Sequence, residues 1–253
     1  MKKCLFLLVA AVLFTGAWST SAMAEAGKFG GEVAVDYASR YIWRGYDLIP
    51  DNNPAVQPRF SVAYGITDEL TVKYLFWADY RLVSGSDRTE ENDNDWDEFD
   101  HVPSLVYTPN DTWSFELGYI LYYLPSLTNT QEVYGGATMA LPANHYTSLY
   151  VYYDFDDDTP DGVYVKLAVG GSQTITEYAK CFYSAGLGYM DYDEGFDDGF
   201  ADLPLTAGIS IDLSRGLSAT ISGNYSFTLD ALEDNDLNDK DEAWLMTGLA
   251  YSF

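Results

Sequence analysis

The sequence predicts an all-β protein, a transmembrane antiparallel up-and-down β-barrel of about 12 strands. Three observations predict it. Residues 243–253 alternate large apolar side chains with small or polar ones and end in the aromatic Phe253. Similar alternating segments recur along the chain, and long polar connections alternate with short turns. Because hydrocarbon offers no partner to an unpaired strand edge, membrane-crossing strands must close into a barrel.

Composition agrees with one barrel domain. The chain has 253 residues, of which 22 are Tyr, and 16% are aromatic. Barrels place aromatic rings at both membrane interfaces, where one end of the ring is dry and the other is wet. Nucleic acid is excluded as a partner, because 39 acidic residues outnumber 13 Lys and Arg and phosphate binding rests on clustered bases.

Residues 1–24 have the pattern of a secretory signal peptide. Two lysines begin it, an apolar run follows over residues 5–14, and Ala22-Met23-Ala24 provides a small-x-small cleavage site. The apolar run is too short to span a bilayer as a helix. The predicted mature domain is therefore residues 25–253, exported and destined for the outer membrane of a Gram-negative cell.

The first strand is predicted to begin at Gly31 and to run to Arg44. Its even positions carry Asp36, Arg40 and Arg44, which would point into the lumen, where charges can pair or meet water. The odd positions would face lipid. They are Val33, Val35, Tyr37, Tyr41 and Trp43.

The same period of two orients the charged residues of the later strands. The second predicted strand turns Gln57 and Arg59 inward, and Pro58 within it suggests a bulge. In the fourth, Val102 and Val106 compete with Leu105 and Tyr107 for the lipid side. Inward positions of the third, fifth and eighth strands hold Lys73, Asp79, Glu116 and Lys166. The twelve predicted strands are residues 31–44, 56–64, 70–80, 98–107, 113–123, 131–141, 148–155, 163–169, 179–190, 203–213, 217–227 and 243–253.

The inward basic residues predict a polar wall that could line a channel for small hydrophilic solutes, anions among them. The competing interpretation is that these charges neutralise one another inside a narrow, closed barrel. The lumen of a twelve-stranded barrel is wider than that of small barrels filled by side chains and narrower than that of large porins. The number of strands therefore does not decide between an open and a closed lumen. The predicted lumen-lining residues are Asp36, Arg40, Arg44, Gln57, Arg59, Lys73, Asp79, Glu116 and Lys166.

No cofactor or metal site is predicted. The spacing Asp154-x-Asp156-x-Asp158 resembles the start of a calcium-binding loop, but Thr159 stands where a glycine is needed. The acidic loops could instead contact divalent cations or lipopolysaccharide at the surface. An enzyme is not predicted, because the two histidines, His101 and His145, have no evident catalytic partner, and Cys181 is interpreted as a packing residue.

One segment carries a family resemblance. Tyr41-Ile42-Trp43-Arg44-Gly45, followed by Pro54-Ala55-Val56-Gln57, resembles the start of the TorF-like family of outer-membrane porins. The resemblance implies an outer-membrane barrel and carries over Arg44, Gly45 and Gln57 as motif positions. Pro58-Arg59 departs from the family, which has glycines after the Gln, and the loops are more acidic.

These observations together predict a channel in the outer membrane. Its expected partners are outer-membrane lipid, lipopolysaccharide, small solutes and the barrel-assembly machinery, which would recognise the last strand ending in Phe253. The alternative is a closed structural or surface-binding barrel whose acidic loops contact cations or lipopolysaccharide.

Overall fold

The fold is known from a computed structural model of the chain. It describes residues 25–49, 53–83, 94–125, 128–155, 161–193, 198–233 and 241–253. The predicted signal peptide and much of the acidic loops, including most of the calcium-like Asp154 segment, lie outside these residues.

Twelve antiparallel strands form one closed sheet, as the sequence predicts. Closure occurs where the last strand pairs with the first, with Val33 opposite Tyr251 and Ala38 opposite Met246. Gly31 and Phe253 exchange two backbone hydrogen bonds of 3.0 Å, so the C-terminal strand has no free edge. The barrel strands are β1 (Phe29–Ala38), β4 (Ala55–Gly65), β5 (Leu70–Arg81), β6 (Asp95–Tyr107), β7 (Trp113–Tyr123), β8 (Thr130–Leu141), β9 (His145–Asp154), β10 (Gly162–Thr176), β11 (Ala179–Tyr192), β13 (Asp202–Ser214), β14 (Leu217–Thr228) and β15 (Glu242–Ser252).

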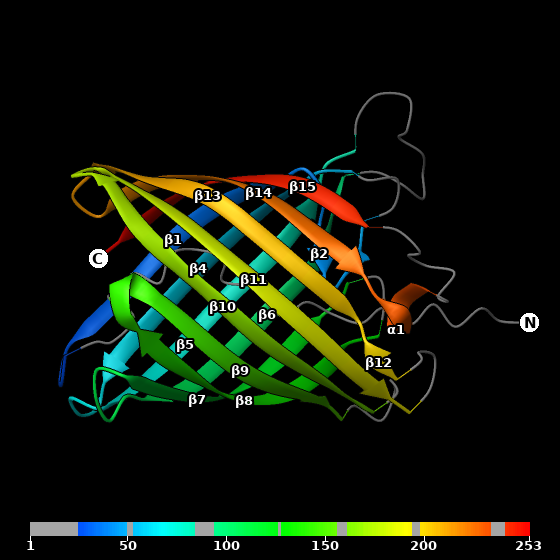
Figure 1. The fold of residues 1–253 in the computed structure, drawn as a ribbon, viewed down its shortest axis with the longest axis horizontal. Helices are drawn as coiled ribbons and strands as arrows, with labels where there is room; N and C mark the ends of the chain where they lie inside the picture. Colours follow the sequence, from blue (N-terminus) through cyan, green and yellow to red (C-terminus); the bar gives the residue numbers. More distant parts are fainter. Residues whose placement is uncertain are drawn as a thin grey trace, which may run out of the picture.

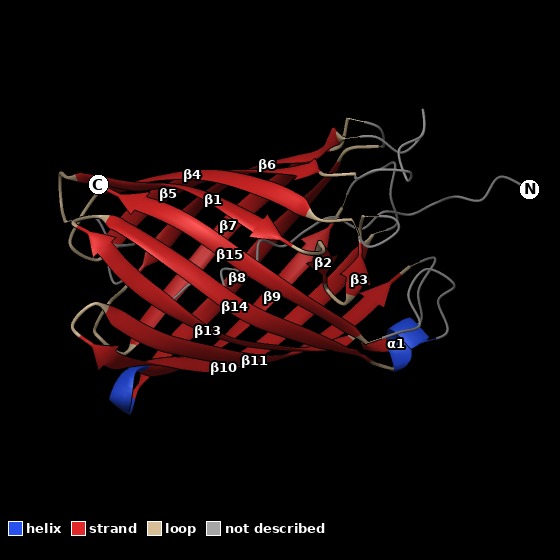
Figure 2. Ribbon diagram, turned by 90° about the horizontal axis from the view of Figure 1, so that it is seen from above, coloured by secondary structure: helices blue, strands red, loops and turns tan. Residues whose placement is uncertain are grey.

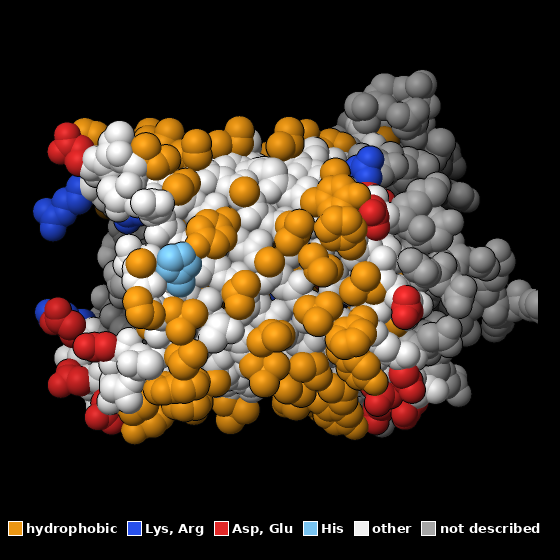
Figure 3. All heavy atoms as spheres, in the orientation of Figure 1, with side chains coloured by type: hydrophobic (Ala, Val, Ile, Leu, Met, Phe, Trp, Pro, Cys, Tyr) orange, Lys and Arg blue, Asp and Glu red, His pale blue; other side chains and the backbone are white. Residues whose placement is uncertain are grey.

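The outer wall is apolar. Leu117 is 64% exposed and Leu249 is 49% exposed, although both lie in the middle of their strands. Figure 3 shows hydrophobic side chains over the length of the wall, with acidic and basic side chains gathered at the two ends. A wall of this kind would be unstable in water, and it suits the hydrocarbon core of a bilayer.

The two ends of the barrel differ. One end carries short turns, such as the 3-10 turn Pro142–Asn144, and the C-terminus (Figure 1). The other end carries the short helix α1 (Asp230–Glu233) and the two-residue strand β12 (Gly199–Phe200). We call these the turn end and the loop end. No helix in the described ranges is long and apolar enough to cross a membrane.

The first predicted strand is too long. β1 ends at Ala38, six residues before Arg44, and the alternation beyond it belongs to a different element. Tyr41 and Trp43 were predicted to face lipid, but they are 7% and 1% exposed inside the barrel. Val33, Val35 and Tyr37, which belong to β1 itself, do face outward.

Two further predictions about strands have clear outcomes. β4 keeps a single register across Pro58 on both sides, so the predicted bulge is wrong. In β6, Val102 and Val106 are buried inside, whereas Leu105 and Tyr107 are each 45% exposed outside. Leu105 and Tyr107 are therefore the residues that face lipid, and the two valines share the inner face of β6 with Glu98, Asp100 and Ser104.

The element after β1 is a hairpin inside the loop end, which we call the lumen hairpin (residues 41–48). Its strands β2 (Ile42–Trp43) and β3 (Tyr46–Asp47) pair with each other and form a sheet separate from the barrel. Figure 2 shows both at the end that carries α1. Arg44 and Gly45 form the turn, with φ of 45° and 88°. Two positive φ angles are typical of a type I′ turn, in which a residue such as Arg is strained.

Candidate functional site

The lumen hairpin fills the loop half of the barrel. Trp43 and the following Ile49 are each 1% exposed, and Tyr46 is 5% exposed. They share one apolar cluster with side chains of the barrel wall and of α1. Wall members of this cluster include Tyr122, Tyr164 and Met190, and Leu232 is the member from α1. The passage through this half is therefore occupied by the chain itself.

Arg44 is the polar centre of the docked hairpin. Its Nη2 donates to Glu132 Oε2 at 2.9 Å, and its Nη1 donates to the Tyr192 hydroxyl at 3.0 Å. Three aromatic rings surround the guanidinium carbon, with centroids 4.4 Å (Trp43), 5.0 Å (Tyr152) and 4.2 Å (Tyr164) away. We call these five partners the arginine cage. Arg44 and Glu132 are 2% and 1% exposed, so this is a fully buried ion pair.

The walls of the loop half are strongly acidic. Besides Glu132, Asp79 and Asp100 are 0% exposed and Glu98 is 3% exposed. The Tyr41 hydroxyl of the hairpin donates to Glu98 Oε2 at 3.0 Å. Buried carboxylates favour a counter-charge, and Arg44 supplies one from the hairpin. The buried acids of this half are Asp79, Glu98, Asp100, Glu132, Asp154, Asp202 and Glu242.

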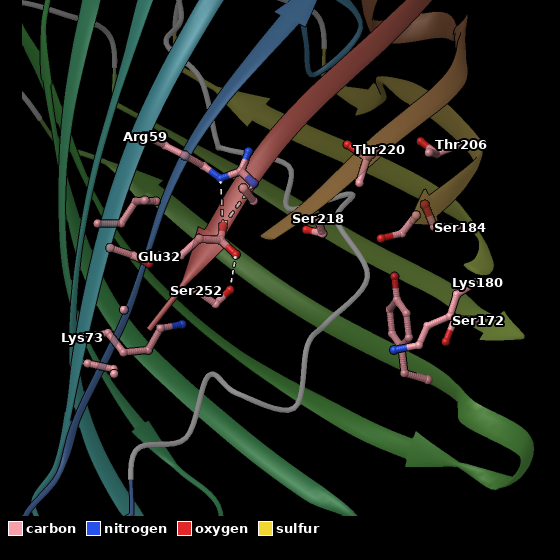
Figure 4. Close-up of a pocket in the computed structure, with 18 of the residues that line it drawn as sticks. Glu32, Arg59, Lys73, Ser172, Lys180, Ser184, Thr206, Ser218, Thr220 and Ser252 are labelled. Atoms are coloured by element: carbon pink, nitrogen blue, oxygen red, sulfur yellow. Dashed lines mark hydrogen bonds and ion pairs between the residues drawn. The ribbon is translucent and has the colours of Figure 1, made fainter. Parts of the chain in front are cut away.

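The turn half contains a cavity of about 840 Å³, which we call the vestibule. Figure 4 shows its two unlike walls. Ser218 and Thr220 of β14 and Ser184 of β11 present small hydroxyls on one side, and Lys73 and the Arg59–Glu32 pair lie on the other. A ring layer of Tyr134, Tyr150 and Tyr152 borders the vestibule on the side of β8 and β9, with the Tyr134 and Tyr152 centroids 5.4 Å apart.

Most predicted lumen residues do point inward, and most of them are paired. Arg59 bonds to Asp36 and, at 3.1 Å, to Glu32. Lys73 Nζ lies 3.9 Å from Glu116 Oε1. Acidic partners therefore neutralise the charges of Arg59 and Lys73, as the closed-barrel interpretation predicts.

Gln57 of β4 and Asp79 of β5 lie opposite each other on neighbouring strands. Gln57 Nε2 donates to Asp79 Oδ1 at 2.8 Å, and both side chains are buried. This pair lies in the loop half. Gln57, one of the family-motif positions, therefore holds one acid of that half in place.

Arg40 and Lys166 complete the predicted set. Arg40 lies after the end of β1 and pairs with Glu242. Lys166 lines the vestibule together with Lys180, which the sequence-based set omitted. Within the described ranges, neither lysine forms an ion pair. The vestibule therefore has basic side chains that its acids do not neutralise directly.

The aromatic partners of Arg44 were not predicted as site residues. Tyr152, Tyr164 and Tyr192 occupy inward positions of β9, β10 and β11. Tyr152 and Tyr164 are directly opposite each other, whereas Tyr192 lies opposite Gly162, two residues along β10. The inward position of each tyrosine could have been predicted from the alternation along its strand. What it could not show is that Arg44 leaves the wall and inserts between them.

His101, His145 and Cys181 lie apart from both halves of the lumen. His101 Nδ1 lies 2.7 Å from the Tyr74 hydroxyl, on an outward position of β6. His145 Nδ1 lies 2.9 Å from the Pro142 carbonyl at the turn end. Cys181 contacts the Gln173 carbonyl at 3.5 Å. Within the described residues, these contacts do not form a triad with an acid and a nucleophile.

No family model matches the chain, and no curated protein matches its sequence, so the resemblance to the TorF-like family is not confirmed. Solved barrels do match its fold. An outer membrane channel from Pseudomonas putida is 13% identical with a TM-score of 0.59, covering 93% of this chain and 98% of that chain. The KdgM porin is 13% identical with a TM-score of 0.54, covering 88% and 99%.

An enzyme is also among the similar structures. The outer membrane phospholipase A from Escherichia coli is 13% identical with a TM-score of 0.52, covering 87% of this chain and 92% of that chain. At such identities the similarity shows the fold, which channels and an enzyme share. The function has to be argued from the lumen.

Proposed function

We propose that the protein is an outer-membrane channel for small hydrophilic solutes, closed in this structure by the lumen hairpin. The observation that carries the proposal is that the closing element is separate from the wall. β2 and β3 pair with each other and not with the barrel sheet. The hairpin can therefore leave the lumen while every ladder hydrogen bond of the barrel stays intact.

Two features of the hairpin suit a reversible closure. Arg44 has a φ of 45°, a strained conformation that costs about 1–3 kcal/mol and persists only while its surroundings hold it. The ion pair with Glu132 and the three rings supply that hold. The strain opposes docking and these contacts favour it, so a change in either shifts the balance between a docked and a released state.

The charge preference of the channel can be inferred from the charged side chains that line the two halves of the lumen. Lys166 and Lys180 favour the predicted anions in the vestibule, whereas seven buried acids line the loop half. When the hairpin leaves, it takes Arg44 with it and the acids of the loop half face the pore. Rings of carboxylates select cations, and the buried acids of the loop half outnumber the two vestibule lysines. We therefore propose that cationic solutes pass preferentially.

A permanently closed structural barrel is the second candidate, and the depth to which the hairpin is buried favours it. In that case the hairpin would be a fixed part of the core. Contacts with lipid, lipopolysaccharide and the barrel-assembly machinery through Phe253 belong to both proposals, as does the lack of an enzymatic activity.

The experiment is planar-bilayer recording of the purified, heat-modifiable protein. A gated channel is expected to be closed for most of the time, with brief openings of uniform size. Liposomes containing it should swell slowly in small hydrophilic solutes. A folded protein that never opens, and whose liposomes swell no faster than empty ones, would exclude the channel and leave the structural barrel.

We expect acid to favour the closed state. Burial raises the pKa of Asp47, in β3, to about 6, and Glu242 adds to this rise, whereas the Ile49 N–H and Arg40 oppose it. Since the docked state holds the proton more tightly than the released state, docking is most stable below about pH 4. Docking weakens as the pH rises through about 6. The fraction of time open should therefore be greater at pH 7.5 than at pH 5.

Asp47→Asn tests whether Asp47 causes this pH dependence. It should flatten much of the change in open fraction between pH 5 and pH 7.5, because the amide does not titrate. An open fraction that rises on acidification, or an unaltered pH profile in Asp47→Asn, would show that Asp47 does not control docking.

A further inference from the structure

The partners of the Arg44 guanidinium come mainly from the barrel wall. Glu132 lies on β8, Tyr152 on β9, Tyr164 on β10 and Tyr192 on β11, four consecutive strands of the closed sheet. Trp43 alone of the arginine cage belongs to the hairpin. When the hairpin leaves, four of the five partners remain in place on a rigid wall.

The wall part of the cage is already ordered to receive a cation. The Tyr122 hydroxyl donates to Glu132 Oε2 at 3.0 Å, and the Tyr164 hydroxyl donates to Asp202 Oδ1 at 2.8 Å. These bonds fix the carboxylate and one ring without help from Arg44. The Tyr152 and Tyr164 ring centroids lie 6.1 Å apart, and Arg44 contacts the faces of both.

The chemistry of these groups is selective. A carboxylate and aromatic faces bind cations, and a planar guanidinium can hydrogen-bond in its plane while it stacks on rings. Two further acids surround the cage, because Asp154 lies close enough to Glu132 to interact with it electrostatically and Asp202 accepts a hydrogen bond from Tyr164. Lys166 lies within electrostatic range of Arg44 but also of Asp202, which offsets its charge. Glu132 and a hydroxyl can receive the in-plane donors of one guanidinium, as they do for Arg44.

We propose that the wall part of the arginine cage is a binding site for guanidinium-bearing solutes, for which Arg44 is a tethered competitor. A solute that occupies the site excludes Arg44 and stabilises the released hairpin, so it opens its own passage. This inference rests on the proposed channel, because it requires a hairpin that can leave. The energetic basis is population shift, since such a solute binds the released state and not the docked one.

The first test measures binding without conduction. Arg44→Ala, purified in detergent, empties the cage, and ethylguanidinium supplies the missing part of the side chain. Calorimetry should detect saturable binding of ethylguanidinium and none of sodium at matched ionic strength. Arg44→Ala combined with Glu132→Gln should bind ethylguanidinium at least about tenfold more weakly, because the charged acceptor is gone. Equal affinity of the single and double variants would overturn the site.

A second variant protects the test against misfolding. Replacing residues 41–48 with a short Gly-Ser linker leaves the barrel ladder unchanged, and its heat-modifiability on a gel reports the fold. This variant should bind ethylguanidinium as well, and its combination with Glu132→Gln should bind it at least about tenfold more weakly. Absence of saturable binding in the folded hairpin-less barrel would also overturn the site.

Conduction separates this inference from the proposed function. In the unsubstituted protein, ethylguanidinium at saturating concentration should raise the open fraction, and sodium should not. If the hairpin-less barrel conducts but binds no ethylguanidinium, the channel stands and the site is wrong. If it binds ethylguanidinium but never conducts, the site stands and the channel is wrong.

Discussion

Arg44→Ala is expected to turn a barrel that is closed for most of the time into one that conducts almost continuously. The substitution removes the hydrogen bonds to Glu132 and Tyr192 and leaves the buried Glu132 carboxylate without its cation while the hairpin is docked. Breaking a buried ion pair in this way costs about 3–5 kcal/mol. The ratio of closed to open barrels should fall by roughly two to four orders of magnitude.

Arg59→Ala is the matched control for this prediction. Arg59 also points inward and pairs with acids, but those acids, Glu32 and Asp36, lie on β1 and not on the hairpin. Its removal should alter the current through an open barrel without changing the open fraction. An Arg44→Ala protein that is folded and as silent as the unsubstituted one would show that Arg44 does not keep the barrel closed.

The second large effect concerns selectivity. In a tenfold salt gradient, the open Arg44→Ala barrel should give a reversal potential of the sign that potassium produces, with potassium preferred to chloride roughly tenfold. The buried acids of the loop half are the reason, because Arg44 no longer balances them. Adding Asp100→Asn and Glu132→Gln should lower the potassium preference, because two of the seven buried acids of this half are then neutral.

Asp212→Asn is the control for position. Asp212 is an acid of the vestibule, at the turn end, where Lys166 and Lys180 are also present. Its loss should change the potassium preference little. A preference for chloride in the open Arg44→Ala barrel would instead show that the vestibule lysines decide selectivity, as the anionic prediction from the sequence requires.

The barrel could be predicted because its signal is local. Each strand alternates between a lipid face and a lumen face, and an inward residue such as Lys73 or Glu116 can be assigned from its neighbours alone. The register of β1 with β4 then brings Arg59 to Glu32 and Asp36, and the register of β4 with β5 brings Gln57 to Asp79. The strand count and the alternation of connections follow from the same pattern.

The lumen hairpin could not be predicted in this way. Tyr41 and Trp43 continue the odd-numbered alternation of β1 in phase, and a single polar residue, Ser39, is too small an interruption to mark the end of a strand. The end of β1 is decided by tertiary contacts, since burial of Trp43 and Ile49 in the apolar cluster of the lumen stabilises the hairpin. The Arg44-Gly45 pair was the available signal, because a two-residue turn with two positive φ angles commonly has Gly second.

The central claim is that one removable hairpin closes an otherwise open barrel. Planar-bilayer recording of the variant in which a Gly-Ser linker replaces residues 41–48 tests it most directly. We predict steady, large, cation-selective conductance in every inserted molecule, with no long closures. A folded variant that stays silent would contradict the claim, because the lumen would then be filled by wall side chains such as the Tyr134, Tyr150 and Tyr152 layer and not by the hairpin.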